Sequence, residues 1–150
     1  MKPIILISSL LLLNTLITEV QAAGLCPTTG QVTTLSVPDL STILTGNTIC
    51  VGPPVFPNVN WESQEYHQSG GSLIDWKQGA SSVADPTAVI GTWSIAGSGA
   101  ATQVTYNYTD GGSSTFSYTV FDNGSNSYSF CQGTNLVVTG MKKTGQGACP

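Results

Sequence analysis

Short segments of this chain alternate between apolar or aromatic residues and small polar residues, and this pattern constrains the fold more than any other feature. Thr105, Asn107, Ser117 and Thr119 separate the apolar positions Val104, Tyr106, Tyr108, Phe116, Tyr118 and Val120. Because successive side chains of a β-strand point to opposite faces, a period of two predicts strands with one apolar and one hydroxyl-lined face. The chain is therefore expected to be all-β.

Further segments extend this pattern into a meander of about seven strands. Residues 89–95 are β-branched and aromatic, 128–130 continue the alternation, 136–139 supply a last strand, and 61–77 form a hairpin around residues 68–71. Asp110-Gly111-Gly112 and Asn123-Gly124 are expected turns, since Gly and Asn accept positive φ. Seven antiparallel strands suit a small barrel or a two-sheet sandwich.

The register of the 61–77 hairpin is decided by charge. One register places Glu65 opposite Asp75, which is repulsive, and another places Glu62 opposite Lys77. We therefore expect Glu62 to face Lys77.

Charge and length limit the partners of the chain. Its 150 residues suit one domain, and only 8% are charged, with a net charge of −4. Lys142 and Lys143 are adjacent, but four cations in the whole sequence give nucleic-acid binding no electrostatic basis. No nucleic-acid partner and no cofactor are expected.

The first 22 residues have the pattern of a secretory signal. Lys2 precedes the apolar run 4–13, and Val20-Gln21-Ala22 offers small residues for cleavage after Ala22. We expect a secreted or periplasmic protein with no membrane segment after cleavage, and a single β domain over 23–150. That domain comprises an amino-terminal arm and proline-rich connector over 23–60, then the hairpin and meander over 61–150.

One short helix is expected in the arm. Ser36 is a candidate N-cap, Pro38 and Asp39 fall in the first turn, and Gly46 follows the last turn. The apolar residues at helical spacing are Val37, Leu40, Ile43 and Leu44.

Four cysteines in an exported chain predict two disulfides. They are Cys26, Cys50, Cys131 and Cys149. Three pairings are possible, and we expect the sequence-local one, Cys26 with Cys50 and Cys131 with Cys149. A zinc site is not expected, because no two cysteines have C-x-x-C spacing and the chain has one histidine.

Two groups of residues are candidates for a site. Titratable residues gather at Glu62, Glu65, His67 and Asp75, where a carboxylate near an imidazole offers acid/base or metal chemistry. The alternative, which we favour, is a polar sheet edge with a solvated His67. Aromatic residues gather at Phe56, Trp61, Tyr66 and Trp76, where they either fill the core or stack on a ligand. The candidate ligand-binding residues are Trp61, Tyr66, His67 and Trp76; no catalytic or metal-binding residue is assigned.

A set of short motifs in this sequence resembles a group of small secreted bacterial proteins without an assigned activity. The motifs span residues 46–149 and comprise Gln64-Glu65-Tyr66-His67, Asp75-Trp76-Lys77, Asp85-Pro86-Thr87, Gly91-Thr92-Trp93-Ser94, residues 104–108 and Tyr128-Ser129-Phe130-Cys131. Gly91-Thr92-Trp93 is also similar to the G-x-W of calycin barrels and of small bacterial barrels that inhibit secreted metalloproteases. The calycin resemblance implies a buried Trp93 that closes one barrel end.

These observations predict a non-enzymatic binding or interaction domain. Its partner is an unknown protein or a small apolar or saccharide ligand. Two alternatives stay open: an inhibitor of a secreted protease, and a hydrolase that uses Glu65 and His67.

Overall fold

The computed structural model of the chain describes residues 24–51, 61, 63–76, 87–109 and 112–150. The expected signal segment, the proline-rich connector with Phe56, Glu62, Lys77 and the Asp110-Gly111 turn lie outside these residues. The elements are β1 (Gln31–Val32), α1 (Leu40–Leu44), β2 (Asn47–Val51), β3 (Ser63–His67), β4 (Ser72–Asp75), β5 (Ala88–Ala96), the 3₁₀ turn η1 (Gly99–Ala101), β6 (Gln103–Tyr108), β7 (Ser114–Gly124), β8 (Ser127–Gln132) and β9 (Asn135–Thr144).

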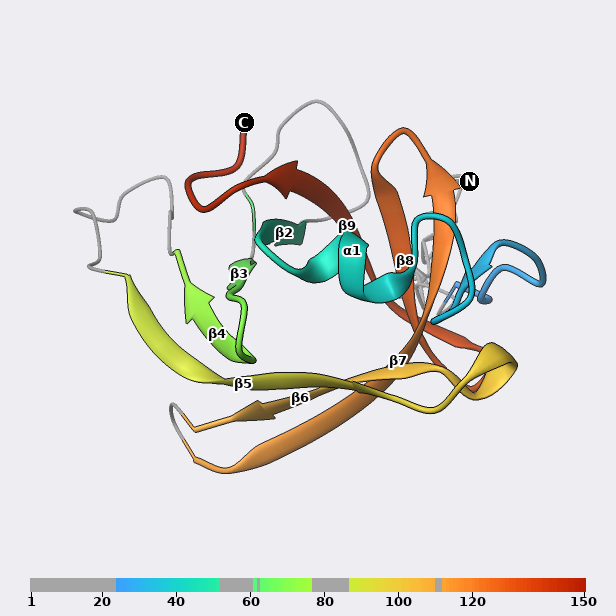
Figure 1. Ribbon diagram of the computed structural model, residues 1–150, viewed down its shortest axis with the longest axis horizontal. Helices are drawn as coiled ribbons and strands as arrows, with labels where there is room; N and C mark the ends of the chain where they lie inside the picture. Colours follow the sequence, from blue (N-terminus) through green and yellow to red (C-terminus); the bar gives the residue numbers. More distant parts are fainter. Residues whose placement is uncertain (1–23, 52–60, 62, 77–86, 110–111) are drawn as a thin grey trace, which may run out of the picture.

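Eight of these strands form a closed antiparallel barrel (Figure 1). From β2 to β9 each strand pairs with the next along the chain, and β9 pairs with β2 to close the ring. The strand β1 lies outside this ring and pairs with β7. The expected all-β fold is confirmed, and of the two expected architectures it is the barrel. The sequence pattern did not reveal β1 or β2.

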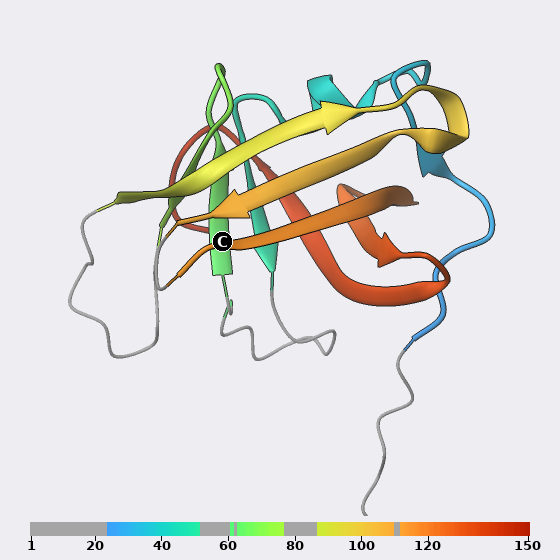
Figure 2. The ribbon, with the colours of Figure 1, turned by 90° about the horizontal axis from the view of Figure 1, so that it is seen from below.

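The two ends of the barrel differ. The helix α1 leads directly into Asn47 of β2 and lies across one end (Figures 1 and 2). The pairings Val51↔Ser63 and Asp75↔Ala88 belong to the opposite end. That opposite end carries the candidate site.

The helix α1 begins later than expected. Asp39, not Ser36, is the N-cap, and its carboxylate accepts a hydrogen bond of 2.7 Å from the backbone N–H of Thr42. Ser36 instead accepts from the backbone N–H of Thr33, so it stabilises the preceding turn. Val37 therefore precedes the helix and is 99% exposed. The other three apolar residues of the expected helix face are buried: Leu40, Ile43 and Leu44.

The structure corrects one expected strand pairing and one expected turn. In the β3–β4 hairpin Glu65 does pair with Asp75, the register that charge repulsion argued against. The physical reason is that burial suppresses the ionisation of Glu65, as described below. The turn between β7 and β8 is centred on Ser125 and Asn126, both at positive φ, with Asn123-Gly124 ending β7.

The core fills the barrel between α1 and the middle of the strands. Its buried apolar residues include those of α1 together with Ile49, Leu73, Ile90, Trp93, Val104, Tyr106, Val120 and Phe130. Trp93 is 8% exposed, as expected, and its indole N–H donates to the carbonyl of Gln68. Gly91 lets β5 approach β6 closely, because a Cβ there would lie 2.1 Å from the carbonyl oxygen of Asn107.

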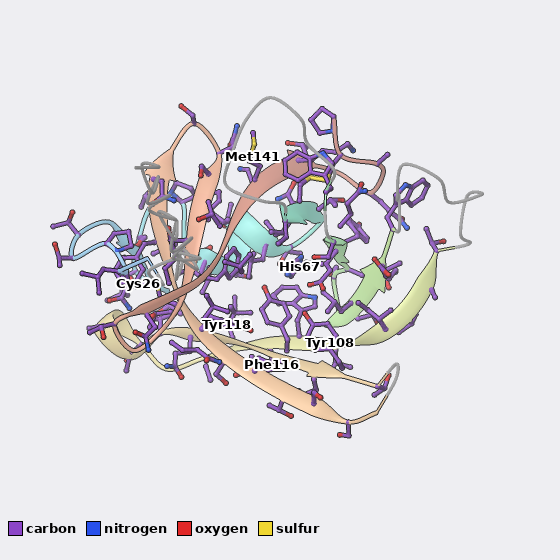
Figure 3. All side chains as sticks on the ribbon, turned by 180° about the vertical axis from the view of Figure 1, so that it is seen from behind. Cys26, His67, Tyr108, Phe116, Tyr118 and Met141 are labelled. Carbon is purple, nitrogen blue, oxygen red and sulfur yellow. A yellow bond between two sulfur atoms is a disulfide. The ribbon has the colours of Figure 1, made fainter. Side chains whose placement is uncertain are left out.

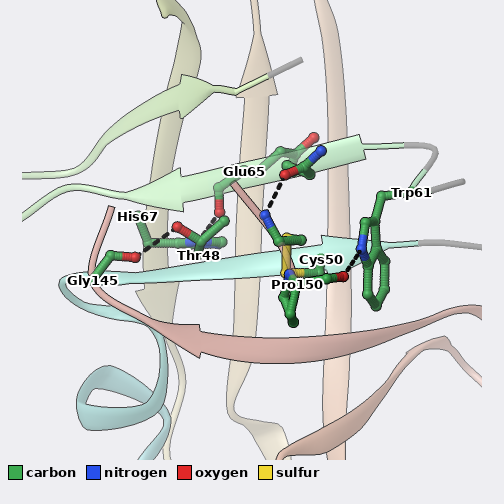
Figure 4. The surroundings of a disulfide bond; sticks show 9 residues. Thr48, Cys50, Trp61, Glu65, His67, Gly145 and Pro150 are labelled. Atoms are coloured by element: carbon green, nitrogen blue, oxygen red, sulfur yellow. Dashed lines mark hydrogen bonds between the residues drawn. A yellow bond between two sulfur atoms is a disulfide. The ribbon is translucent and has the colours of Figure 1, made fainter. Parts of the chain in front are cut away.

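The disulfides are Cys26–Cys131 and Cys50–Cys149, so the expected sequence-local pairing is wrong. The arm runs beside the β8–β9 turn, where the N–H of Cys26 donates to the carbonyl of Thr134, and this brings Cys26 to β8. The segment after β9 lies beside β2 and β3, where the N–H of Cys149 donates to the side chain of Gln64 (Figure 4). Each bridge ties a terminal segment to a barrel strand.

The bridges bear on the compartment of the protein. Disulfides form and persist in oxidising surroundings, so two of them indicate a non-reducing environment. Within the described residues, no helix has the length and apolarity needed to cross a membrane.

Candidate ligand-binding site

The strand β3 places two titratable side chains on the inner face of the barrel. Glu65 and His67 are two residues apart and share that face, whereas Tyr66 lies on the other. The pairing of β3 with β4 sets Asp75 beside Glu65, and aromatic side chains from β6 approach both Glu65 and His67. The cluster therefore forms inside the barrel.

His67 is fully buried, with 0% of its surface exposed, so the expectation of a solvated histidine is wrong. Its Nδ1 lies 3.1 Å from the backbone carbonyl of Glu65, which only accepts, so Nδ1 carries the proton (Figure 4). Its Nε2 accordingly accepts from the hydroxyl of Tyr106 at 2.9 Å. Burial lowers the pKa of His67 to about 4, and the ring is neutral at physiological pH.

Glu65 is a carboxyl group largely removed from water. Burial raises its pKa to about 7, the hydrogen bond from Tyr108 opposes this shift, and the neighbouring charge of Asp75 adds to it. The Tyr108 hydroxyl is 3.0 Å from each carboxyl oxygen of Glu65. Because much of Glu65 is protonated near neutrality, its pairing with Asp75 does not bring two full charges together.

Aromatic rings from β6, β7 and β8 form one continuous wall. The Tyr106 ring stacks on Tyr108 with centroids 6.2 Å apart and packs against Tyr118 at 5.9 Å, which in turn meets Phe130 edge-on. Figure 3 shows Tyr108, Tyr118 and His67 gathered in the middle of the molecule, whereas Cys26 lies toward its periphery. Burial raises the pKa values of Tyr106 and Tyr108, so both hydroxyls stay protonated.

A cavity of about 110 Å³ lies against this wall, toward the barrel end opposite α1. Its lining is mainly aliphatic and aromatic, with one carboxyl group. The lining residues are Ile49, Val51, Ser63, Glu65, Tyr106, Tyr108, Tyr118, Phe130 and Val138. Apolar walls with a few convergent polar groups are characteristic of small-molecule sites.

No family of known proteins matches this chain, and neither does a curated protein or a solved structure. The assignment of this site therefore depends on its geometry.

The four expected ligand-binding residues are not brought together at this cavity. Trp61 donates its indole N–H to the carbonyl of Pro150, Tyr66 lies on the outer face of β3, and Trp76 follows β4. These three are partly buried and belong to neither the cavity lining nor the core. His67 does not line the cavity, but it forms a hydrogen bond with Tyr106, which does.

Sequence reasoning missed the residues that do line the cavity. The alternation places Tyr106, Tyr108 and Tyr118 on the apolar face of the predicted strands, but it does not mark that face as a binding site. The signal was present: three tyrosines on inward-facing positions bring three hydroxyl groups into a barrel, and buried hydroxyl groups need polar partners.

The described residues hold no group of three or more His, Cys, Asp or Glu side chains able to bind a metal ion. A second hollow of about 700 Å³ lies beside α1 and the 68–71 turn. Its lining consists mainly of small and hydroxyl side chains, those of Thr34, Ser41, Thr45, Ser69, Gly70, Gly71, Trp93, Ser94 and Ile95. It brings together no titratable group, so the barrel cavity is the stronger candidate.

Proposed function

We propose that this protein is an exported, non-enzymatic binding protein whose barrel interior holds a small molecule. The observation that carries the proposal is the cavity of about 110 Å³, lined by apolar residues from five strands and by the side chain of Glu65. A barrel filled by side chains would leave no such space, because protein interiors pack to the density of organic crystals. The disulfides and the signal-like first 22 residues support export.

The size of the cavity limits the ligand. An apolar cavity of about 150 Å³ holds a benzene molecule, so this smaller one suits a ligand, or the end of a ligand, of roughly five non-hydrogen atoms. The best small ligands gain at most about 1.5 kcal/mol per atom, which bounds the free energy of binding near 7 kcal/mol. The expected affinity is therefore micromolar at best, unless the ligand extends beyond the cavity.

Hydrolysis by Glu65 and His67 has less support. A general base needs a free nitrogen within reach of the substrate, but both ring nitrogens of His67 have partners within the fold. The ring is also behind Tyr106 and fully buried. No observation in the described residues specifically supports protease inhibition.

The test uses three probes of four carbon atoms: butylammonium, 1-butanol and butyrate. Each is titrated into the full, disulfide-bonded protein while the amide signals of Tyr106 and Tyr118 are followed by NMR. At least one probe should give a saturable shift. Val138→Phe, which fills the cavity, should abolish that shift, whereas Val137→Phe at the neighbouring exposed position should keep it.

Failure of all three probes to bind would overturn the proposal. Saturable binding that survives Val138→Phe would place the ligand elsewhere and would also overturn it. Mass spectrometry of the protein purified under native conditions provides a second readout, since a copurified small molecule should be absent from Val138→Phe.

A further inference from the structure

We infer that the ligand of the barrel cavity is a small organic cation, a primary ammonium with a short hydrocarbon group, bound by the carboxylate of Glu65. This inference rests on the proposed binding function and adds the class of ligand.

The hydrogen-bonding groups that line the cavity offer mainly acceptors. Tyr108 donates its proton to Glu65 and Tyr106 donates its proton to His67, so both hydroxyl protons are already used. The two hydroxyl oxygens retain lone pairs, and an ionised carboxylate has about four acceptor positions, of which the Tyr108 proton occupies only part. Apart from the hydroxyl groups of Ser63 and Tyr118, which can also donate, the polar groups that line the cavity offer acceptors. A ligand group that carries only donors matches them, and an ammonium has three.

The walls of the cavity are mainly aromatic and aliphatic. The rings of Tyr106, Tyr108, Tyr118 and Phe130 all line the cavity. Aromatic faces attract cations through their ring quadrupole, and they offer nothing comparable to an anion. Ile49, Val51 and Val138 supply an apolar surface for the hydrocarbon part of the ligand.

Among the described residues, the side chains that line the cavity with Glu65 include no cation. Glu65 faces Asp75 on β4, Tyr106 and Tyr108 on β6 and Tyr118 on β7, all of them acidic or neutral groups. From β2, β8 and β9 the lining is hydrocarbon or aromatic. On β9, Lys142 pairs with Ile49 and lies closer to the α1 end than Gly140 does. An anion placed against Glu65 would be repelled, whereas an ammonium would neutralise the charge of this carboxylate.

Ionisation of Glu65 then becomes coupled to binding. With the pKa of its carboxyl near 7, Glu65 is half-ionised at neutrality in the empty barrel. The ammonium binds the ionised form, so its apparent affinity scales with the ionised fraction. Between pH 8 and pH 6 the affinity for butylammonium should fall about tenfold, while the affinity for 1-butanol should stay constant.

The experiment measures dissociation constants for the same three probes by NMR titration or calorimetry at pH 8. Butylammonium should bind at least about tenfold more tightly than 1-butanol, a preference typical of one charge-assisted hydrogen bond, and butyrate should bind most weakly. Glu65→Gln should bring the ratio of butylammonium to 1-butanol affinity close to one. Asp122→Asn, which removes one negative charge from an exposed position on β7, should leave the ratio unchanged.

The possible failures are distinct. Equal affinities for butylammonium and 1-butanol in the unmodified protein would overturn the inference and leave the binding function intact. A cation preference that persists in Glu65→Gln would remove Glu65 from the site and would also overturn it. Absence of binding by every probe would overturn both. The pH dependence of butylammonium affinity in the unmodified protein tests the same inference without any variant. An affinity that stays constant between pH 8 and pH 6 would overturn it.

Discussion

The carboxyl group of Glu65 binds its proton more tightly in the folded protein than in the unfolded chain. Its pKa in the folded protein, about 7, lies above the ordinary value of 4.5. The folded state therefore binds more protons than the unfolded state between these two values. The contribution of Glu65 to stability is fully present below pH 4.5 and is lost as the pH rises through 7.

We predict that Glu65→Gln stabilises the protein at pH 8 by about 2–3 kcal/mol, because glutamine can accept the Tyr108 hydrogen bond without ionising. The gain should shrink toward zero at pH 4.5, where the native carboxyl is already protonated. Urea denaturation at both pH values measures the difference. A gain of the same size at both would show that the ionisation of Glu65 is not the cause.

His67 has the opposite linkage. Its pKa falls from 6.5 to about 4 on folding, so its contribution to stability is fully present above pH 6.5 and is lost as the pH falls toward 4. The two contributions oppose each other between about pH 4.5 and 6.5. In Glu65→Gln, the stability should therefore rise with pH over this interval more steeply than in the unmodified protein.

The tautomer of His67 gives a direct spectroscopic prediction. At pH 6 the ring should be neutral, with Nδ1 protonated and Nε2 unprotonated, because the Glu65 carbonyl accepts from one nitrogen and Tyr106 donates to the other. Nitrogen-15 chemical shifts of the imidazole distinguish this form from the other tautomer and from the cation. Titration with a midpoint near 6.5 would contradict the buried position.

At the scale of elements, the contact between β5 and β6 depends on Gly91. A Cβ at this position would lie 2.1 Å from the Asn107 carbonyl oxygen, so the backbone of one strand would have to move. We predict that Gly91→Ala destabilises the fold by about 1–3 kcal/mol, the usual cost of overpacking. Ser94→Ala serves as the control, because Ser94 is an exposed, outward-pointing residue of the same strand. It should change the stability by less than about 0.5 kcal/mol in the same denaturation assay.

The strands whose sequence alternates clearly between apolar and polar residues were predictable, and β2, whose sequence does not, was missed. Residues 104–108 and 116–120 lie in β6 and β7, as the alternation of Tyr and Thr or Ser predicts. In β2, the central residues Thr48, Ile49 and Cys50 are all buried, so no alternation marks the strand. Its Thr48 is satisfied by a hydrogen bond of 2.8 Å to the carbonyl of Gly145, a contact from the far end of the chain.

The candidate site was predictable only as a cluster of titratable residues. The sequence places Glu65, His67 and Asp75 close together, but repulsion between Glu65 and Asp75 requires both carboxyls to be ionised and solvated. Inside a barrel, burial changes the ionisation first, and this repulsion is then weakened. The partners Tyr106 and Tyr108 come from a strand about 40 residues away in sequence, which local pattern reasoning does not connect.

At the scale of the whole molecule, the disulfides hold both terminal segments against the barrel. Cys50–Cys149 encloses a sequence separation of 99 residues and Cys26–Cys131 one of 105. Through the loss of loop entropy in the unfolded chain, each bridge contributes roughly 4–5 kcal/mol, more than the short loops of the expected pairing would give.

We predict that the paired variant Cys50→Ala with Cys149→Ala loses about 4 kcal/mol of unfolding free energy in urea. Cys26→Ala with Cys131→Ala serves as the matched comparison, because the two loops are nearly equal in length. In the intact protein no thiol should react with an alkylating agent before reduction, since all four cysteines are bridged. A loss below about 1 kcal/mol in either variant would contradict the loop-entropy argument.

Closure of the barrel by β2 and β9 has a consequence for how the chain reaches its fold. Asn47 pairs with Thr144, so the ring joins the first strand of the barrel to be made to the last one. Contacts between residues so distant in sequence slow folding, because a long loop must be ordered before they form. On the ribosome, β2 and its hairpin can pair on one side only, and the other side stays open until β9 emerges. The slow step of folding should therefore be the joining of these two strands.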